Sequence, residues 1–271
     1  MGMNGVIMKR VIWLFCVLLA VARVSLADPS QQEWQNNTKT ANYSFPVGEK
    51  LTYSISWSTV IEAGISTMEV KEGNKVGGRP TYDVVSSTRS VGIVDLFFPV
   101  RETVESIIDA DEIFSISFHL QESHGKKTRQ RDMNYDRVKG VVRVSVNNGK
   151  PETYTVPDRI QDALSSLYYV RTRQDFIIGN SILVDVHDGD KTWAVEVHVL
   201  GKERIKTPVG EFDTIKVKTY PKYEGVFMNK GEIYIWFTND SRKIPLIMKS
   251  EIAIGSIVAT IIDIQGRKDK Q

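Results

Sequence analysis

Alternation of apolar and polar residues runs through most of this chain, and it constrains the fold more than any other feature. In LTYSISWS, Leu51, Tyr53, Ile55 and Trp57 fall on one face of an extended strand, and Thr or Ser falls on the other. Because successive side chains of a β-strand point to opposite faces, this pattern predicts a strand with one buried face.

Similar segments recur along the chain, and turn-forming residues separate them. We expect further strands at residues 65–70, 81–87, 101–108, 114–121, 141–146, 193–200, 212–219, 233–237 and 244–264. Asn-Gly, Asp-Gly and Gly-Gly pairs lie in several separators, most of which are too short for the crossovers of a parallel sheet. The sequence therefore predicts a mainly β protein with a single antiparallel curved sheet, or a partly open barrel of half-barrel shape.

One segment, PDRIQDALSSLYYVRTR, departs from this alternation. From Ile160 to Val170 its apolar residues recur at spacings of three, one, three and three, which is typical of one helix face. Pro157 and Asp158 are typical of a helix start. We predict one amphipathic helix of about four turns, packed on the sheet as a plug across the barrel mouth or as a pad on an open face.

Residues 1–27 have the organisation of a secretory signal peptide. A basic pair precedes an apolar run at residues 11–22, and Ser25 and Ala27 lie three and one residues before a cleavage point ahead of Asp28. The run is shorter than the roughly 20 residues that a membrane-spanning helix needs. We expect cleavage and a periplasmic or secreted protein without a membrane span; a retained signal anchor is the alternative.

The remaining chain divides by composition. Residues 28–44 are rich in Gln, Asn, Thr and Ser, which predicts a flexible leader. Residues 45–265 contain no internal repeat or change of composition and predict a single β-rich domain. Residues 266–271 form a basic tail.

Net charge and cysteine content exclude several classes of function. Cleavage removes three of the 35 basic residues and none of the 33 acidic ones, which leaves 32 basic residues against 33 acidic ones. Without an excess of positive charge, we expect no nucleic-acid partner. The one cysteine, Cys16, lies in the signal segment, so the mature chain has neither a disulfide nor a thiol nucleophile.

The segment TNDSRK joins two apolar runs and offers candidate catalytic side chains. Asn239 and Asp240 are residues that form local turns, and Ser241 is not part of a Gly-x-Ser-x-Gly elbow. We interpret this segment as a hairpin turn.

The histidines have no spacing that indicates a catalytic site. His119, His124, His187 and His198 lie in different segments, and nothing in the sequence joins them to a serine and an acidic residue as a triad. We therefore expect no catalytic residues and no cofactor.

The segment DVHDGDKTW offers possible metal ligands in Asp185, His187, Asp188 and Asp190. It lacks the distant carboxylate of an EF-hand loop and the paired histidines of a helical zinc site. An Asp-Gly hairpin with His187 on a strand face accounts for it better, and we expect no metal.

The densest basic cluster consists of Lys126, Lys127, Arg129 and Arg131, and its two arginines share a strand face. Such a cluster could bind an anionic head group or a polysaccharide. A solvated strand face is the commoner explanation and the one that we favour.

The segment VGIVDLFFPV, residues 91–100, is apolar without alternation. It either belongs to the core or forms a lip over an apolar ligand. Burial in the core is the default expectation for so apolar a segment.

Several short motifs, taken in order, resemble a known family. They are VGEKLTY at residues 47–53, EAG at 62–64, DALSSLYYVR at 162–171, TPVGEF at 207–212, and a segment from IWFT at 235–238 through IP at 244–245 to GS at 255–256. The chain resembles the secreted Gram-negative proteins of domain-of-unknown-function family 3108. The resemblance covers nearly all of residues 45–264 and carries over no catalytic residues. The expected architecture also looks like the half-barrel carriers that shuttle lipids or lipoproteins across the periplasm.

These features favour a non-enzymatic periplasmic protein that binds an apolar ligand, a lipid or a lipidated partner, in a curved β-sheet. The residues predicted to line the site are Tyr53, Ile55, Trp57, Phe97, Phe98, Leu164 and Leu167. The alternative is an envelope-assembly module that binds protein or glycan through a sheet edge. An envelope hydrolase is a remote third hypothesis.

Overall fold

The alternating segments pair into one antiparallel sheet. The computed structural model describes residues 45–174, 176–223, 226–227, 233–251 and 255–266, and within these residues fifteen strands belong to the sheet. The predicted signal peptide, the predicted leader up to residue 44 and residues 267–271 of the predicted tail lie outside the described residues.

Among the described residues, two helices interrupt the succession of strands, α2 (Gly92–Phe97) and α3 (Ala163–Thr172). The strands are β1 (Lys50–Trp57), β2 (Ile61–Glu72), β3 (Thr81–Ser90), β4 (Val100–Asp109), β5 (Ser115–His124), β6 (Lys127–Asp136), β7 (Val141–Val146), β8 (Glu152–Thr155), β9 (Ser181–Asp188), β10 (Lys191–Thr207), β11 (Gly210–Tyr223), β12 (Val226–Phe227), β13 (Ile233–Thr238), β14 (Pro245–Glu251) and β15 (Ser256–Gln265). The segment 244–264, predicted as one alternating run, is thus two strands.

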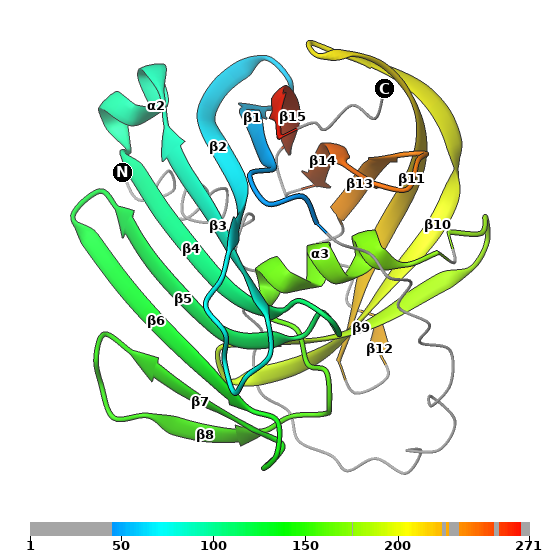
Figure 1. Ribbon diagram of the computed structural model, residues 1–271. Helices are drawn as coiled ribbons and strands as arrows, with labels where there is room; N and C mark the ends of the chain where they lie inside the picture. Colours follow the sequence, from blue (N-terminus) through cyan, green and yellow to red (C-terminus); the bar gives the residue numbers. More distant parts are fainter. Residues whose placement is uncertain (1–44, 175, 224–225, 228–232, 252–254, 267–271) are drawn as a thin grey trace.

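The sheet follows the order β8-β7-β6-β5-β4-β3-β2-β1-β15-β14-β13-β11-β10-β9, with β12 beside β11. Pairing of β1 with β15 brings the first and last strands of the domain together. The sheet curls around α3, and its two ends, β8 and β9, are not joined by a strand ladder (Figure 1). The prediction of a mainly β, half-barrel-like sheet is confirmed.

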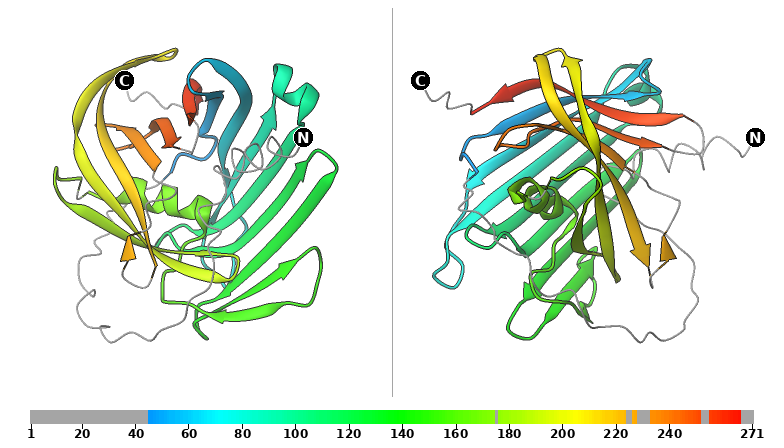
Figure 2. Two further views of the ribbon diagram at one scale, coloured as in Figure 1. Left: turned by 180° about the vertical axis from the view of Figure 1, so that it is seen from behind. Right: turned by 90° about the vertical axis from the view of Figure 1, so that its right-hand side faces the viewer.

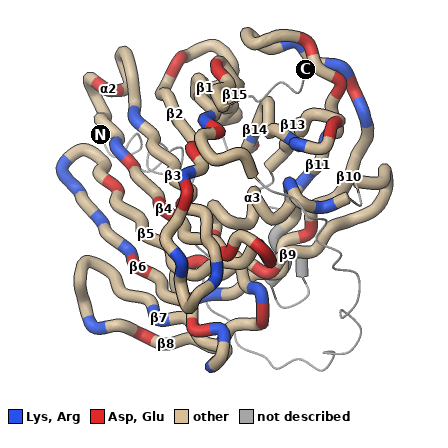
Figure 3. Tube along the Cα trace, in the orientation of Figure 1, with Lys and Arg blue, Asp and Glu red and all other residues tan. Residues whose placement is uncertain are grey.

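The concave face of the sheet carries the core. Leu51, Tyr53 and Ile55 of β1 are buried as the alternation predicts, and β15 places Ala259 and Ile261 opposite two of them. Acidic and basic residues are interspersed along β4, β5 and β6 (Figure 3), which fits the nearly neutral net charge.

The two ends of the sheet lie side by side although no ladder joins them. Arg131 of β6 forms an ion pair with Asp188 of β9, and the rings of Tyr154 in β8 and His187 in β9 are 5.6 Å apart. The backbone of Gln161 also pairs with β9, since its carbonyl accepts from the N–H of His187 at 2.8 Å. Side chains and one short bridge therefore take the place of the missing ladder.

Helix α3 is shorter than predicted. The expected start at Pro157 and Asp158 is wrong, because the backbone of Gln161 is extended and pairs with β9. The helix begins only after Asp162, whose carboxylate accepts hydrogen bonds from the N–H groups of Leu164 and Ser165, both at 2.8 Å. An N-cap of this kind sets the first turn of a helix.

The two helices lie at opposite ends of the half-barrel (Figure 2, right). Helix α2 connects the end of β3 to the start of β4, whereas the cap of α3 meets β4 six residues further on, where Ser106 donates to Asp162 at 2.6 Å. The described residues contain no helix long and apolar enough to cross a membrane.

Candidate functional site

The α3 end is held by a buried ion pair. Both terminal nitrogens of Arg171 donate to the carboxylate of Glu49, at 2.7 and 2.9 Å, and both side chains are almost fully buried. The guanidinium lies over the rings of Phe45 and Tyr168, about 5 Å from each centroid, and also donates to the carbonyl of Arg242 at 3.3 Å. One side chain thus joins the helix to the residue that precedes β1 and to the turn between β13 and β14.

The segment TNDSRK is the turn that the sequence predicts. Strands β13 and β14 pair on either side of it. The carboxylate of Asp240 accepts from the hydroxyl of Thr238 at 2.7 Å and from the backbone N–H of Arg242 at 3.0 Å. Burial acts to raise the pKa of Asp240, but these bonds and the Arg242 side chain outweigh it and leave the pKa lowered.

Tyr53 belongs to the same packed end. Its hydroxyl donates to the carbonyl of Pro245 at 2.8 Å, and burial raises its pKa well above the ordinary value for tyrosine. Tyr53 therefore acts as a neutral hydrogen-bond donor in the core. Three of the motifs that carry the family resemblance meet at this end. The motif at residues 47–53 contributes Glu49 and Tyr53, the motif at 162–171 contributes Arg171, and the last segment contributes Pro245.

The α2 end differs in exposing large apolar side chains. Leu96 and Phe97 of α2 are 77% and 73% exposed, and Val60 of the β1–β2 turn is 84% exposed. The backbone N–H of Val91 donates to the carbonyl of Ala63 at 3.1 Å, so α2 starts beside β2. The burial expected for residues 91–100 is wrong for α2, because the segment folds as a six-residue helix with no buried residue.

We call the exposed apolar side chains at this end the apolar rim. Its members are Val60, Ile61, Ile93, Leu96 and Phe97.

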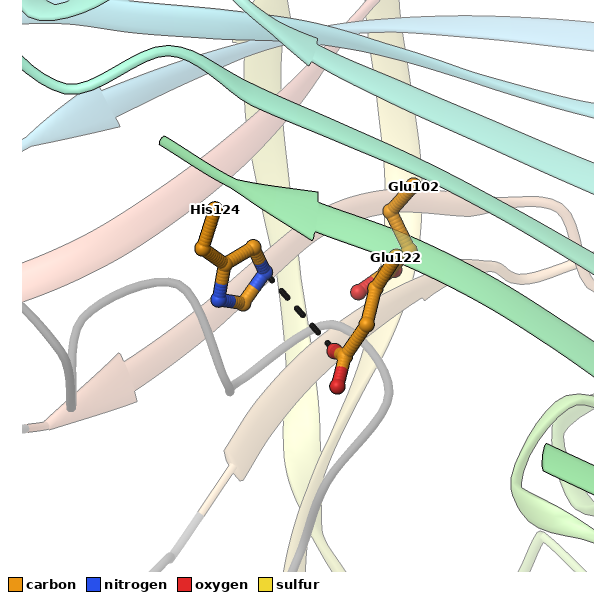
Figure 4. A group of neighbouring side chains, drawn as sticks. All are labelled: Glu102, Glu122 and His124. Carbon is orange, nitrogen blue, oxygen red and sulfur yellow. Dashed lines mark ion pairs between the residues drawn. The ribbon is translucent and has the colours of Figure 1, made fainter. Parts of the chain in front are cut away.

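Just inside the α2 end, the concave face carries two carboxylates and an imidazole (Figure 4). Glu102 of β4 and Glu122 of β5 are both buried, and His124 is half-buried. The ring nitrogen Nε2 of His124 lies 3.7 Å from Glu122 Oε2. No residue of this group except His124 appears among the sequence-based candidates. One signal in the sequence could have indicated this group. Glu102 lies between Val100 and Val104 on one strand face, and an acidic residue on an apolar face is unusual.

The basic cluster also turns inward. Arg129 and Arg131 share a strand face as predicted, but that face lies in the interior of the half-barrel. The prediction that they lie on a solvated strand face is therefore wrong. Arg131 is 3% exposed and pairs with Asp188. Arg129 Nη1 lies 3.9 Å from Glu122 Oε1, and burial is the largest cause that lowers its pKa.

The structure does not bring the seven predicted site residues into one cluster. Tyr53, Ile55 and Leu164 are buried in the core, and Trp57 and Leu167 pack against it. Phe97 and Phe98 lie at α2, where Phe98 has its ring 6.4 Å from that of His124. Strand β1 therefore connects two regions, with Tyr53 toward α3 and Trp57 toward α2.

One serine lies beside a histidine on the outer face. Ser181 Oγ is 2.9 Å from His198 Nδ1 and donates to Glu196 at 2.5 Å. In a catalytic triad the acidic residue orients the histidine, whereas here Glu196 accepts from the serine itself. This geometry does not activate Ser181 as a nucleophile.

The segment DVHDGDKTW forms the predicted hairpin between β9 and β10. His187 is buried, with Nδ1 3.0 Å from the hydroxyl of Thr192 and Nε2 3.1 Å from the carbonyl of Gly189. Burial lowers the pKa of His187. Both ring nitrogens have protein partners, which fits a structural role.

A family model for a protein of unknown function, DUF3108, matches residues 52–262, which include Arg171 of the α3 end and all of α2. The chain belongs to the DUF3108 family. The predicted family is therefore confirmed. Comparison of this DUF3108 chain with proteins of curated function gives no match.

A solved structure supports the fold of this DUF3108 domain. A β-barrel-like protein of domain of unknown function DUF1849 from Brucella abortus matches with a TM-score of 0.53 and 13% identity, over 81% of this chain and 97% of that chain. A protein with a YmcC-like fold from Bacteroides fragilis matches with a TM-score of 0.31 and 10% identity, over 82% and 98% of the two chains. The similarity to the Brucella protein supports a β-barrel-like fold and nothing further. The TM-score of the Bacteroides protein is too low to support any conclusion.

Proposed function

We propose that this DUF3108 protein is a non-enzymatic, periplasmic or secreted binding protein. It takes an apolar ligand, a lipid or the lipid of a lipidated partner, at the α2 end of the half-barrel. The single observation that carries the proposal is the apolar rim, which is exposed at the end opposite the packed helix α3. The extracytoplasmic location rests on the signal-like residues 1–27.

The rim is chemically suited to an acyl chain. Large apolar side chains gathered at one place on a surface mark interaction sites more often than isolated ones do. Burial of an acyl chain gains about 0.8 kcal/mol per methylene, so about ten methylenes offset the cost of immobilising the ligand. Trp57 and Phe98, both half-buried at this end, extend the apolar surface inward from the rim.

The sheet-edge alternative has less support. Strand β8 offers only four residues for pairing, and Gln161 already occupies part of the outer side of β9. Addition of a partner strand needs a row of accessible backbone groups. The hydrolase hypothesis lacks support too, because Ser181 has no oriented base.

The test is binding of a fluorescent fatty acid to the mature protein, residues 28–271. We expect saturable binding that weakens at least tenfold in the double variant Leu96→Ser, Phe97→Ser. Both side chains are exposed, so the variant is expected to keep its fold.

Val138→Ser is the matched control, because Val138 is 98% exposed in the β6–β7 turn, at the other end of the strands. It should bind the probe as the wild type does. Absence of saturable binding, or equal affinity in the double variant and the wild type, would overturn the proposal.

A further inference from the structure

The register of β4 and β5 places three ligand-type side chains together inside the α2 end. Glu102 and Glu122 are direct cross-strand partners, and His124 follows two residues after Glu122 on the same face. Residues two apart on a strand share a face, and cross-strand partners are the closest neighbours in a sheet. One ligand atom from each of the three residues lies within 4.8 Å of the other two.

Within this arrangement, Glu122 and the Nε2 atom of His124 have no partner at hydrogen-bond distance among the described residues. The side chain of Glu122 is only 8% exposed, and its oxygens lie 3.7 Å from His124 Nε2 and 3.9 Å from Arg129 Nη1. Both separations exceed hydrogen-bond distance. Among the described residues, the buried Nε2 of His124 has no hydrogen-bond partner. A buried ring nitrogen of this kind requires an explanation.

The pairing of the two carboxylates also favours a cation. Like charges directly opposite each other in a sheet are destabilising. Glu102 and Glu122 are opposite each other in this way. A divalent cation bound between them would offset this repulsion.

The distance between Glu122 and His124 suits such an ion. Zinc binds histidine nitrogen and carboxylate oxygen at about 2.0–2.2 Å, so two ligands of a tetrahedral ion are about 3.4 Å apart. The 3.7 Å gap between Glu122 Oε2 and His124 Nε2 is too long for a hydrogen bond and close to the span that a bound ion bridges. Figure 4 shows these two side chains pointing toward each other, with Glu102 alongside.

We propose that Glu102, Glu122 and His124 bind one divalent first-row transition-metal ion. A mixed nitrogen and oxygen ligand set suits Zn²⁺ and its neighbours better than Ca²⁺ or Mg²⁺. Three protein ligands leave a coordination position for water or for an anionic group. The three residues are not members of the apolar rim, so a test of metal binding does not depend on whether the proposed lipid ligand binds.

The experiment is titration of metal-free, untagged mature protein with Co²⁺, followed by visible absorption, and with Zn²⁺, followed by calorimetry. We expect one equivalent of metal to bind and a Co²⁺ spectrum typical of nitrogen and oxygen ligation. Affinity should fall at least tenfold in Glu122→Gln and in His124→Ala.

His119→Ala is the matched control. His119 lies on the same strand, and its Nδ1 is 2.6 Å from Asp132. This variant should bind metal as the wild type does. Glu102→Gln provides a second carboxylate test if Glu122→Gln fails to fold. Absence of stoichiometric binding by the wild type, or unchanged affinity in folded His124→Ala, would overturn the proposal.

Discussion

The two ends of the half-barrel are made from the same strands but differ in what covers them. At the α3 end, the ten-residue helix has a buried cap, and Arg171 is fully enclosed by protein partners. At the α2 end, the six-residue helix has no side-chain cap and buries no residue. The two ends therefore differ in how far the protein covers its own apolar side chains, which is almost complete at α3 and incomplete at α2.

Among the variants that test this contrast, we expect replacement of Arg171 to cause the largest change in the free energy of unfolding. Arg171→Met should reduce the free energy of unfolding by about 3–5 kcal/mol, because the carboxylate of Glu49 stays buried without its partner. Urea unfolding followed by tryptophan fluorescence measures the change. The double variant Glu49→Gln, Arg171→Met should recover part of the loss. A loss below about 1 kcal/mol in the single variant would mean that the ion pair does not hold the α3 end.

Removal of the cap of α3 should have the next largest effect. The carboxylate of Asp162 is fully buried and accepts from Ser106, Ser115 and two backbone N–H groups. Asp162→Ala should cost about 2 kcal/mol in unfolding free energy. Burial is the largest cause that raises the pKa of Asp162, so Asp162→Asn should cost less than the alanine variant. Thermal and urea unfolding measure both variants. Equal losses of unfolding free energy in Asp162→Ala and Asp162→Asn would contradict this account.

A smaller effect is expected at the turn beside Arg171. Asp240→Asn keeps an oxygen that accepts from Thr238 and from the backbone of Arg242, so unfolding free energy should change by about 0.5 kcal/mol or less. Ligand binding at the α2 end should not change. A folded Asp240→Asn protein that loses binding of the fatty acid would show that the α3 end is part of the site.

The smallest effect concerns the attachment of α2. Hydrogen bonds from Arg101 and Ser90 lower the pKa of Asp95 to about 2, against about 3.9 for an unperturbed aspartate. Because the folded-state pKa is the lower one, this attachment is complete above about pH 4 and is lost as pH falls toward 2. Amide hydrogen exchange in α2 should accelerate over that window while β1 stays protected. In Asp95→Asn the acceleration should be absent. Exchange in α2 that does not depend on pH in the wild type would exclude this attachment.

Much of the fold was predictable because its signals are local. The alternation in LTYSISWS predicts both a strand and its buried face, and Asn or Gly residues mark the turns. The start of α3 was not predictable, because Gln161 pairs with β9, a strand that follows it in the sequence. Long-range pairing overrides local helix preference at that position.

The candidate sites were predictable only in part. Residues 91–100 have a composition that indicates either core or lip, and their exposure depends on where the connection between β3 and β4 lies on the curved sheet. The same composition would be buried if another element covered it. Arg129 and Arg131 share a face by periodicity alone, but the curvature of the sheet decides that this face is the interior.

The family, the antiparallel strands and one amphipathic helix can be recognised in the amino-acid sequence, because neighbouring residues carry these signals. The contact of Glu49 with Arg171 and the convergence of Glu102, Glu122 and His124 inside the α2 end become visible only in the folded chain. Such contacts depend on register and curvature, which arise when the whole sheet curls around α3. No local period of the sequence encodes them.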